Sequence, residues 1–316
     1  MGALGAAGLL LSFGVYAEPY PSQPVRLVIP FDAGSATDVL ARVIGQAMSG
    51  DLGQPVIVEN VGGAGSTIGV KRVIASKADG YTVLISSNAG VVSSPAGLIR
   101  NAGYDPLTEL VPVGKIAHVY YVLTTNKDFP ADSTEQFIQA VKKKPGRYNY
   151  ATANAGSQVY MAVLKQKFEL NLEEIPYKST PAALTDLLTG RVETMFLDIT
   201  SAKSRIEAGE IKAFAISSEK RSAIAPDIPT LSEAGVADVP DMSGWWGMYV
   251  PKGTDSAVVD RLSSSLKKAL HDSDVVKRIN GMGLDITWAD PQQLASFHAS
   301  QMESWKDAIT KFDMAK

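Results

Sequence analysis

Three times along this chain, an apolar segment with the pattern of a β-strand runs through a Gly/Ser-rich loop into a helical pattern. The three segments are VRLVIPF-DAGSAT-DVLARVIGQAM from Val25, VIVEN-VGGAGST-IGVKRVIA from Val56 and YNYATA-NAGSQ-VYMAVLKQKF from Tyr148. Such a loop directs the unpaired N–H groups of the first helical turn, together with the positive end of the helix dipole, at one point in space. Each unit therefore offers a place where an anion can bind.

The rest of the chain continues to alternate between strand and helix patterns, which predicts parallel sheets with helices on both faces. Two β-rich segments, residues 113–125 and 242–250, look like strands that leave one domain and enter another. We therefore predict an α/β protein whose first domain combines residues 18–118 and 244–316, with residues 119–243 inserted as a second domain. The two crossing strands would form a hinge beside a central cleft. Because ligands of open α/β sheets bind at the carboxyl ends of the strands, both domains should contribute loops to this cleft.

The N-terminal residues 2–17 form an apolar run that ends in Val15-Tyr16-Ala17, a pattern typical of signal-peptide cleavage. A run of about 14 apolar residues is short for a spanning helix, which needs roughly 20, although a membrane anchor is the alternative interpretation. We predict a signal peptide over residues 1–17 and export to the periplasm. The usual basic start is missing, because no Lys or Arg precedes Arg26.

Composition and missing motifs argue against several function classes. The net charge of −3 disfavours nucleic-acid binding. The second glycine-rich loop has Ile68 where a GxGxxG fingerprint needs its third glycine, and no Gly-Lys-Ser/Thr triplet occurs. The chain has no cysteine and no GxSxG motif, and its three histidines, His118, His271 and His298, lack metal-ligand spacing. We predict no catalytic residue, metal or cofactor, and interpret each histidine as structural or exposed.

Candidate ligand-binding residues follow predicted strands in both domains. In the first domain they are Gly34, Ser35, Ala36 and Thr37 of the first loop, Gly65, Ser66 and Thr67 of the second loop, and Asn88 after the third strand. In the second domain they are Asn154, Gly156, Ser157, Tyr177, Lys178 and Asp198. The backbone amides are the expected anion donors, and Lys178 is the candidate cation.

Several of these side chains also have a purely structural interpretation. Thr37 or Asp38 would cap the first helix, and Asp198 would cap a helix beginning near Ser201. Lys178 would be a solvated surface lysine. The pair Trp245-Trp246 would form an aromatic wall of the cleft or, as we favour, part of the hinge core.

An ordered set of nine motifs resembles that of the periplasmic substrate-binding proteins of tripartite tricarboxylate transporters, the Bug-type receptors. The motifs are PFDAGSATD with the following AR (30–38 and 41–42), VENVGGAGSTIG (58–69), ADGYTVL (78–84), YDP (104–106), PGRYNYATANAGS (145–157), PY (176–177), DLLTGRV (186–192), PDIPTLSEAG (226–235) and WWGMYVPKGT (245–254). The resemblance covers nearly all of the mature chain. The sequence departs from the family at Ala33 and Ser35, where Pro and Gly are commoner, and at Val61-Gly62, where Arg-Pro is usual. These changes alter loop stiffness and add a hydroxyl group.

The resemblance implies a monomeric receptor with a Venus-flytrap fold of type II, which closes on a small organic carboxylate and delivers it to integral membrane subunits. One carboxylate group would be held by Phe31, residues 34–37 and residues 65–67, and the far end of the ligand would meet the second domain. A dicarboxylate, a tricarboxylate, an aromatic acid or an amino acid would fit this class. Two alternatives stay open: a co-receptor that reports the ligand to a membrane signalling protein, and a secreted α/β enzyme acting on an anionic substrate.

Overall fold

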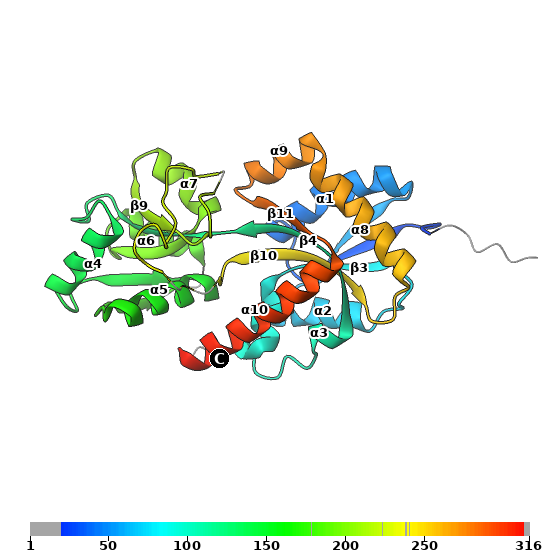
Figure 1. The fold of residues 1–316 in the computed structure, drawn as a ribbon, viewed down its shortest axis with the longest axis horizontal. Helices are drawn as coiled ribbons and strands as arrows, with labels where there is room; N and C mark the ends of the chain where they lie inside the picture. The colour runs from blue at the N-terminus through cyan, green and yellow to red at the C-terminus, as the bar shows by residue number, and fades with distance from the viewer. Residues whose placement is uncertain (1–19, 178, 223, 238, 240, 313–316) are drawn as a thin grey trace, which may run out of the picture.

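The computed structural model describes residues 20–312 apart from residues 178, 223, 238 and 240. The predicted signal peptide and Lys178 therefore lie outside the described residues. Figure 1 shows two α/β halves, each built on its own sheet and joined by strands that run between them. The predicted two-domain α/β fold is confirmed, while the domain boundaries at residues 118/119 and 243/244 stay a prediction. In the described part of the chain, no helix combines the length and the hydropathy that a membrane span requires.

The first half contains a mixed six-stranded sheet in which three neighbouring strands at one end are parallel. In spatial order its strands are β11 (Asp285–Ala289), β4 (Leu110–Val119), β10 (Gly244–Pro251), β3 (Thr82–Ser87), β1 (Val25–Ile29) and β2 (Val56–Asn60). Strands β1, β2 and β3 are parallel, and β10 runs antiparallel to β3 and β4. Strand β1 is buried on both faces apart from the exposed Arg26, as expected for a mostly apolar parallel strand.

Helices cover both faces of this first sheet. They are α1 (Ala36–Leu52), α2 (Thr67–Ile74), α3 (Pro106–Glu109), α8 (Ser256–His271), α9 (Ser273–Gly281) and α10 (Pro291–Lys311), with the short helical segments η1 (Ala64–Ser66) and η2 (Ala89–Leu98). One face packs against α1, α8 and α9, and the other against α2, η2 and α10 (Figure 1). Helix α10 begins at Pro291, and the preceding Asp290 forms a reciprocal capping box with Gln293.

The second half contains a five-stranded sheet. In spatial order its strands are β7 (Glu173–Pro176), β6 (Asn149–Thr152), β8 (Thr194–Asp198), β5 (Tyr121–Asn126) and β9 (Ile211–Ile216). Its helices are α4 (Thr134–Lys143), α5 (Ala155–Phe168), α6 (Thr180–Leu188) and α7 (Ile199–Glu207). Strands β6, β7 and β8 are parallel, and β5 is antiparallel to both of its neighbours.

The chain crosses between the halves at two adjacent points. The sequence predicts one strand over residues 113–125, but the structure divides it at Tyr120 into β4 and β5, which belong to different sheets. Val119 at the end of β4 pairs with Gly244 at the start of β10, so the outgoing and returning chains lie side by side. Trp245 and Trp246 on the returning strand are both buried, which confirms their interpretation as hinge core.

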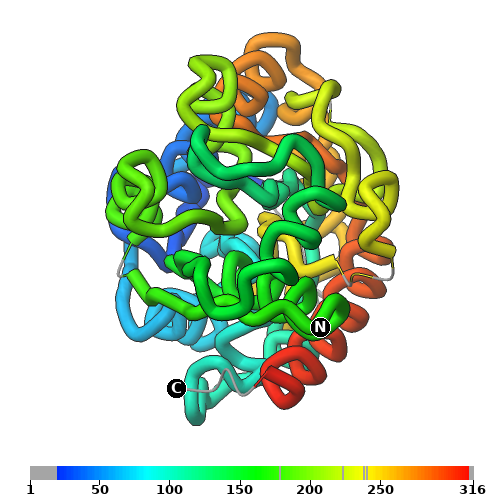
Figure 2. Tube along the Cα trace, turned by 90° about the vertical axis from the view of Figure 1, so that its left-hand side faces the viewer, coloured from blue at the N-terminus to red at the C-terminus, as the bar shows by residue number. Residues whose placement is uncertain are grey.

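Strand register brings the carboxyl edges of both sheets to this crossing. In the first half, Ser87 at the end of β3 pairs with Trp246, near the start of β10. In the second half, Asp198 at the end of β8 pairs with Tyr121, the first residue of β5. The loops that follow β1, β2 and β3 therefore lie on one side of the crossing, and those that follow β6, β7 and β8 lie on the other. In Figure 2 the second half lies in front of the first, so the view runs along the direction in which these edges face each other.

Candidate functional site

The first loop turns strand β1 into helix α1 within six residues. Ser35 is the N-cap, and its hydroxyl accepts a hydrogen bond from the N–H of Asp38 at 3.3 Å. The capping role that the sequence suggests for Thr37 or Asp38 is therefore wrong, because the N-cap lies two or three residues earlier than expected. Among the described residues, no acceptor is found for the N–H groups of Ala36 and Thr37, the first two residues of the helix.

The expectation that all four amides of this loop are open is wrong for two of them. The N–H of Gly34 donates to Oδ2 of Asp38 at 2.9 Å, and the N–H of Ser35 donates to the carbonyl oxygen of Asp32 at 3.2 Å. Both bonds arise because Gly34, with φ of +83°, turns the loop back over the helix. The open donors are therefore concentrated at Ala36 and Thr37.

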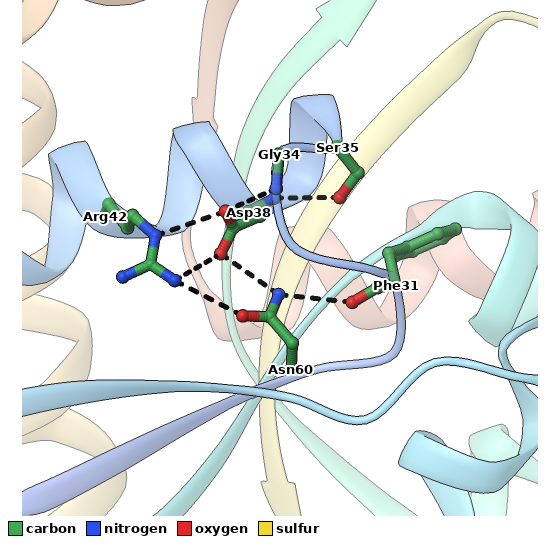
Figure 3. A network of polar contacts seen from close by, with 6 residues as sticks. All are labelled: Phe31, Gly34, Ser35, Asp38, Arg42 and Asn60. Carbon is green, nitrogen blue, oxygen red and sulfur yellow. Dashed lines mark hydrogen bonds and ion pairs between the residues drawn. The ribbon is translucent and has the colours of Figure 1, made fainter.

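A charged network lies directly beneath this loop (Figure 3). The Asp38 side chain is almost fully buried, and its two oxygens accept from Nε of Arg42 at 3.2 Å and from Nη2 of Arg42 at 3.0 Å. Nδ2 of Asn60, the last residue of β2, donates to Oδ1 of Asp38 at 3.0 Å and to the carbonyl oxygen of Phe31 at 3.2 Å. The network joins the end of β1, the end of β2 and the first turn of α1.

The same network sets the ionisation of Asp38. Burial by itself raises the pKa of this carboxyl, but the hydrogen bonds from Arg42, Gly34 and Asn60 outweigh it and hold the pKa below its ordinary value. Asp38 is therefore ionised at neutral pH and paired with Arg42. No candidate site residue that the structure describes is a lysine or an arginine, so an anion at the first loop would be bound by backbone amides and the helix dipole.

A second bond ties the first loop to the crossing. Nε1 of Trp246 on β10 donates to Oγ1 of Thr37 at 2.8 Å, and both side chains are buried. The hydroxyl of Thr37 is thereby held against the hinge. The neighbouring Asn88 also binds the returning chain, with Nδ2 donating to the carbonyl oxygen of Ser243 at 3.3 Å.

The second glycine-rich loop has an unusual backbone. Residues 63–66 all have positive φ, although two of them, Ala64 and Ser66, are not glycine. The conformation is held by the N–H of Ser66, which donates to the carbonyl oxygen of Gly63 at 3.1 Å, and by Oγ1 of Thr67, which donates to the carbonyl oxygen of Ala64 at 2.9 Å. Oγ of Ser94 donates to the carbonyl oxygen of Gly65 at 2.8 Å. Helix α2 follows directly, so its N-terminus lies at the same edge as that of α1.

The second half presents the N-terminus of α5. Asn154 is the N-cap: its Oδ1 accepts from the N–H of Ser157 at 2.9 Å, and Oγ of Ser157 accepts from the N–H of Asn154 at 3.2 Å. The hydroxyl of Tyr121 donates to the same Oδ1 at 3.0 Å. The described residues contain no acceptor for the N–H groups of Ala155 and Gly156.

Gly156 is required by a close approach. A Cβ atom at this position would lie 2.4 Å from Cζ and 2.5 Å from the hydroxyl oxygen of Tyr121. The Tyr121 ring therefore rests on the backbone of the first turn of α5. Since Tyr121 is the first residue of β5, the crossing strand directly positions this helix end.

The other candidates of the second half have local partners. The hydroxyl of Tyr177 donates to Oδ2 of Asp186 at 2.7 Å. Asp198 is the N-cap of α7, where its Oδ1 accepts from the N–H of Ser201 at 2.9 Å and from the hydroxyl of Thr200. The capping interpretation of Asp198 is confirmed, and its second oxygen, Oδ2, has no hydrogen-bond partner among the described residues.

The histidines have packing roles or face solvent. His118 on β4 contacts Tyr120 and the ring of Phe297, and His298 on α10 lies against Tyr249 and the carbonyl oxygen of Val91. Desolvation lowers the pKa of both to about 4, so both are neutral at pH 7. His271 is exposed at the end of α8.

Sequence reasoning missed Arg42, Asn60 and Tyr121. The spacing of Asp38 and Arg42, four residues apart on a helix, is a signal that could have identified their ion pair. Asn60 and Tyr121 carry no such local signal, because their contacts depend on which strands pair and where the chain crosses between sheets.

Comparison with known proteins places the whole arrangement in context. The family model described as "Tripartite tricarboxylate transporter family receptor" matches residues 40–314. Protein BugT of Bordetella pertussis is 34% identical over 299 residues, which cover 93% of this chain and 91% of BugT. MatC of Rhodopseudomonas palustris, solved with bound malate, has a TM-score of 0.74 and 29% identity, covering 92% of this chain and 100% of that one. Rpa4515 of R. palustris, solved with adipate, has a TM-score of 0.79 and 27% identity, covering 94% and 99%.

Proposed function

Because this chain belongs to the receptor family of the tripartite tricarboxylate transporters, we propose that it is a periplasmic receptor for a small organic carboxylate. It would bind the carboxylate in a cleft between its two halves and deliver it to the integral membrane subunits of a transporter. One observation carries the proposal. The carboxyl edges of both sheets meet at the crossing strands, and helices α1 and α5 each present two N–H groups without an acceptor among the described residues there.

The two halves would hold opposite ends of the ligand. One carboxylate group would accept hydrogen bonds from the amides of Ala36 and Thr37, within a contact set of Phe31, Gly34, Ser35, Gly65, Ser66, Thr67 and Asn88. The far end would meet Asn154, Gly156, Ser157, Tyr177, Lys178 and Asp198. Hydrogen bonds from amides to an ionised carboxylate are stronger than those between neutral groups, which supports a site that binds an anion with amides alone.

Binding would close the two halves about the crossing strands. A hinge of this kind stabilises the closed state only to the extent that the ligand contacts both halves better when they are closed. The chain would bind its ligand without transforming it. Two carboxylates near the proposed site support this, because Asp38 and Asp198 each accept a hydrogen bond from a backbone N–H group at a helix end.

A thermal-shift screen tests the proposal. The chain from residue 18 would be unfolded and refolded to remove any bound ligand, then screened against malate, adipate, tricarboxylates, aromatic acids and amino acids. Ligand at 100 times its Kd should stabilise the fold by about 2.7 kcal/mol. Adipamide, which matches adipate in length but carries no charge, is the control. A rise in Tm with one carboxylate class and none with its amide would support the proposal; folded protein that responds to no carboxylate would contradict it.

A further inference from the structure

The two halves touch beside the crossing strands, where the turn between α9 and β11 meets the first turn of α7. Gly283 lies in this turn, and a Cβ atom on it would lie 2.9 Å from Cα and 2.9 Å from Cγ2 of Thr200. Real Cβ atoms do not approach other heavy atoms this closely, so even one methyl group here would push the two halves apart. The first half therefore rests on the second through backbone at Gly283.

The same glycine also ends a helix. It has φ of +77°, and the next residue closes the helix end, with the N–H of Leu284 donating to the carbonyl oxygen of Ile279 at 3.3 Å. Any substitution at Gly283 therefore adds backbone strain to the contact with Thr200. Gly53 separates these two effects, because it ends α1 with φ of +70° and a Cβ atom there would meet nothing within 4 Å.

The surroundings form a continuous contact between the halves. Ile199 of α7 shares one apolar cluster with Ile279 and Leu284 of the first half, and all three are almost completely buried. Two residues beyond Gly283, Oδ2 of Asp285 accepts from the hydroxyl of Ser222 at 2.6 Å, which adds a polar bond to the segment between β9 and β10. The turn that contains Gly283 is thus held by contacts with the second half on either side, so we expect a displacement at Gly283 to move the halves relative to each other.

We propose that the contact of Gly283 with Thr200 sets the angle between the two halves, and that Gly283 is a positioning residue for the ligand site. Thr200 donates its hydroxyl to Asp198, which caps α7 at the carboxyl edge of β8. A wedge between Gly283 and Thr200 would therefore shift this edge relative to the loops after β1 and β2. The effect on the angle stands on geometry alone, and the effect on affinity rests on the proposed function.

The test compares Gly283→Ala with Gly53→Ala, which carries the same backbone strain without the contact. Isothermal titration would use malate and adipate. Overpacking destabilises a packed contact, and we expect the shifted angle between the halves to weaken binding by about tenfold or more in Gly283→Ala and by less than about twofold in Gly53→Ala. Equal losses in the two variants, or none in either, would overturn the proposal.

A distance measurement makes the result independent of the ligand. Because the chain has no cysteine, spin labels can be placed at Leu107→Cys in the first half and Gln139→Cys in the second, both exposed positions. In ligand-free protein, Gly283→Ala should shift the mean distance between the labels, and Gly53→Ala should leave it unchanged. Unshifted distances in both variants would contradict the proposal even if binding were weakened.

A compensating substitution covers the case in which Gly283→Ala does not fold. Thr200→Gly removes the Cβ and Cγ2 atoms that the new methyl group would meet, so the double variant Gly283→Ala/Thr200→Gly should recover most of the inter-label distance of Thr200→Gly alone. No recovery would overturn the contact. If the unmodified protein binds neither acid while the label distances shift as expected, the proposed ligand class fails and the hinge contact stands.

Discussion

Helices α1 and α5 begin at facing edges of the two sheets, but their N-termini are held by different chemistry. Below α1, the buried carboxylate of Asp38 is paired with Arg42 and bonded to Asn60. At α5, the N-terminus is held by a neutral capping box of Asn154 and Ser157, and the Tyr121 ring packs against it. Both arrangements leave the first two N–H groups of the helix without an acceptor among the described residues.

The two helix ends leave backbone amides without an acceptor in two different ways. A charged network can hold a loop whose outer surface is open, as at α1, where a Cβ atom on Gly34 would meet nothing within 4 Å. A neutral cap needs tight packing instead, as at α5, where the ring of Tyr121 leaves no room for a Cβ atom on Gly156. The first arrangement should depend on pH, and the second on side-chain volume.

The largest expected loss of stability comes from adding side-chain volume at the packed helix end of α5. Gly156→Ala would force the Tyr121 ring off the first turn of α5 and should lower the free energy of unfolding by about 3 kcal/mol. Gly34→Ala adds its methyl group in open space and should cost about 1 kcal/mol, the strain of a left-handed alanine. Urea denaturation measures both. Equal losses would break the distinction between a packed and an open helix end.

A smaller loss of stability is expected from removing the charged partner of Asp38 at α1. Arg42→Met leaves the buried Asp38 carboxylate without its cation and should cost about 2 kcal/mol at pH 7. Asn154→Ala removes a neutral cap and should cost about 1 kcal/mol. The pH dependence of stability distinguishes the two variants further, because only Arg42→Met changes the pKa of a buried carboxyl group, that of Asp38.

The sign of this pH dependence follows from Asp38. Its pKa in the folded protein lies below the unfolded value of about 3.9, so its contribution to stability is complete above that pH and is lost as the pH falls through the folded pKa. Arg42→Met raises the folded pKa and should move the acid-unfolding midpoint to higher pH. The buried His118 and His298 destabilise the fold below about pH 6.5 in every variant, so they cancel in the difference. The same acid shift in Asn154→Ala would contradict this account.

The sequence predicts the elements well because each carries a local signal. The apolar run of β1, the glycine-rich loops and the Asp290-Pro291 helix start are read within a few residues. The family motifs locate the loops that supply candidate amides. Three features depend on tertiary structure and could not be read: the break at Tyr120, the bond from Asn60 to Asp38, and the contact between Gly283 and Thr200. Each joins segments whose pairing is fixed only when the two sheets have formed.

The most direct test of the proposed carboxylate site removes one backbone N–H group from the first turn of α1. Ala36 is the first residue of α1 and follows Ser35 in an extended conformation, so Ala36→Pro deletes its N–H at the position where helices accept proline best. Ser256→Pro makes the same change at α8, whose N-terminus lies at the opposite edge of the first sheet.

The measurement is isothermal titration of both variants with the carboxylate that stabilises the unmodified protein. Loss of a hydrogen bond to a charged group typically costs about 1.5–3 kcal/mol, so Ala36→Pro should weaken binding by about tenfold or more with little change in Tm. Ser256→Pro should bind like the unmodified protein. Unchanged affinity in Ala36→Pro would contradict the claim that the α1 amides hold the ligand.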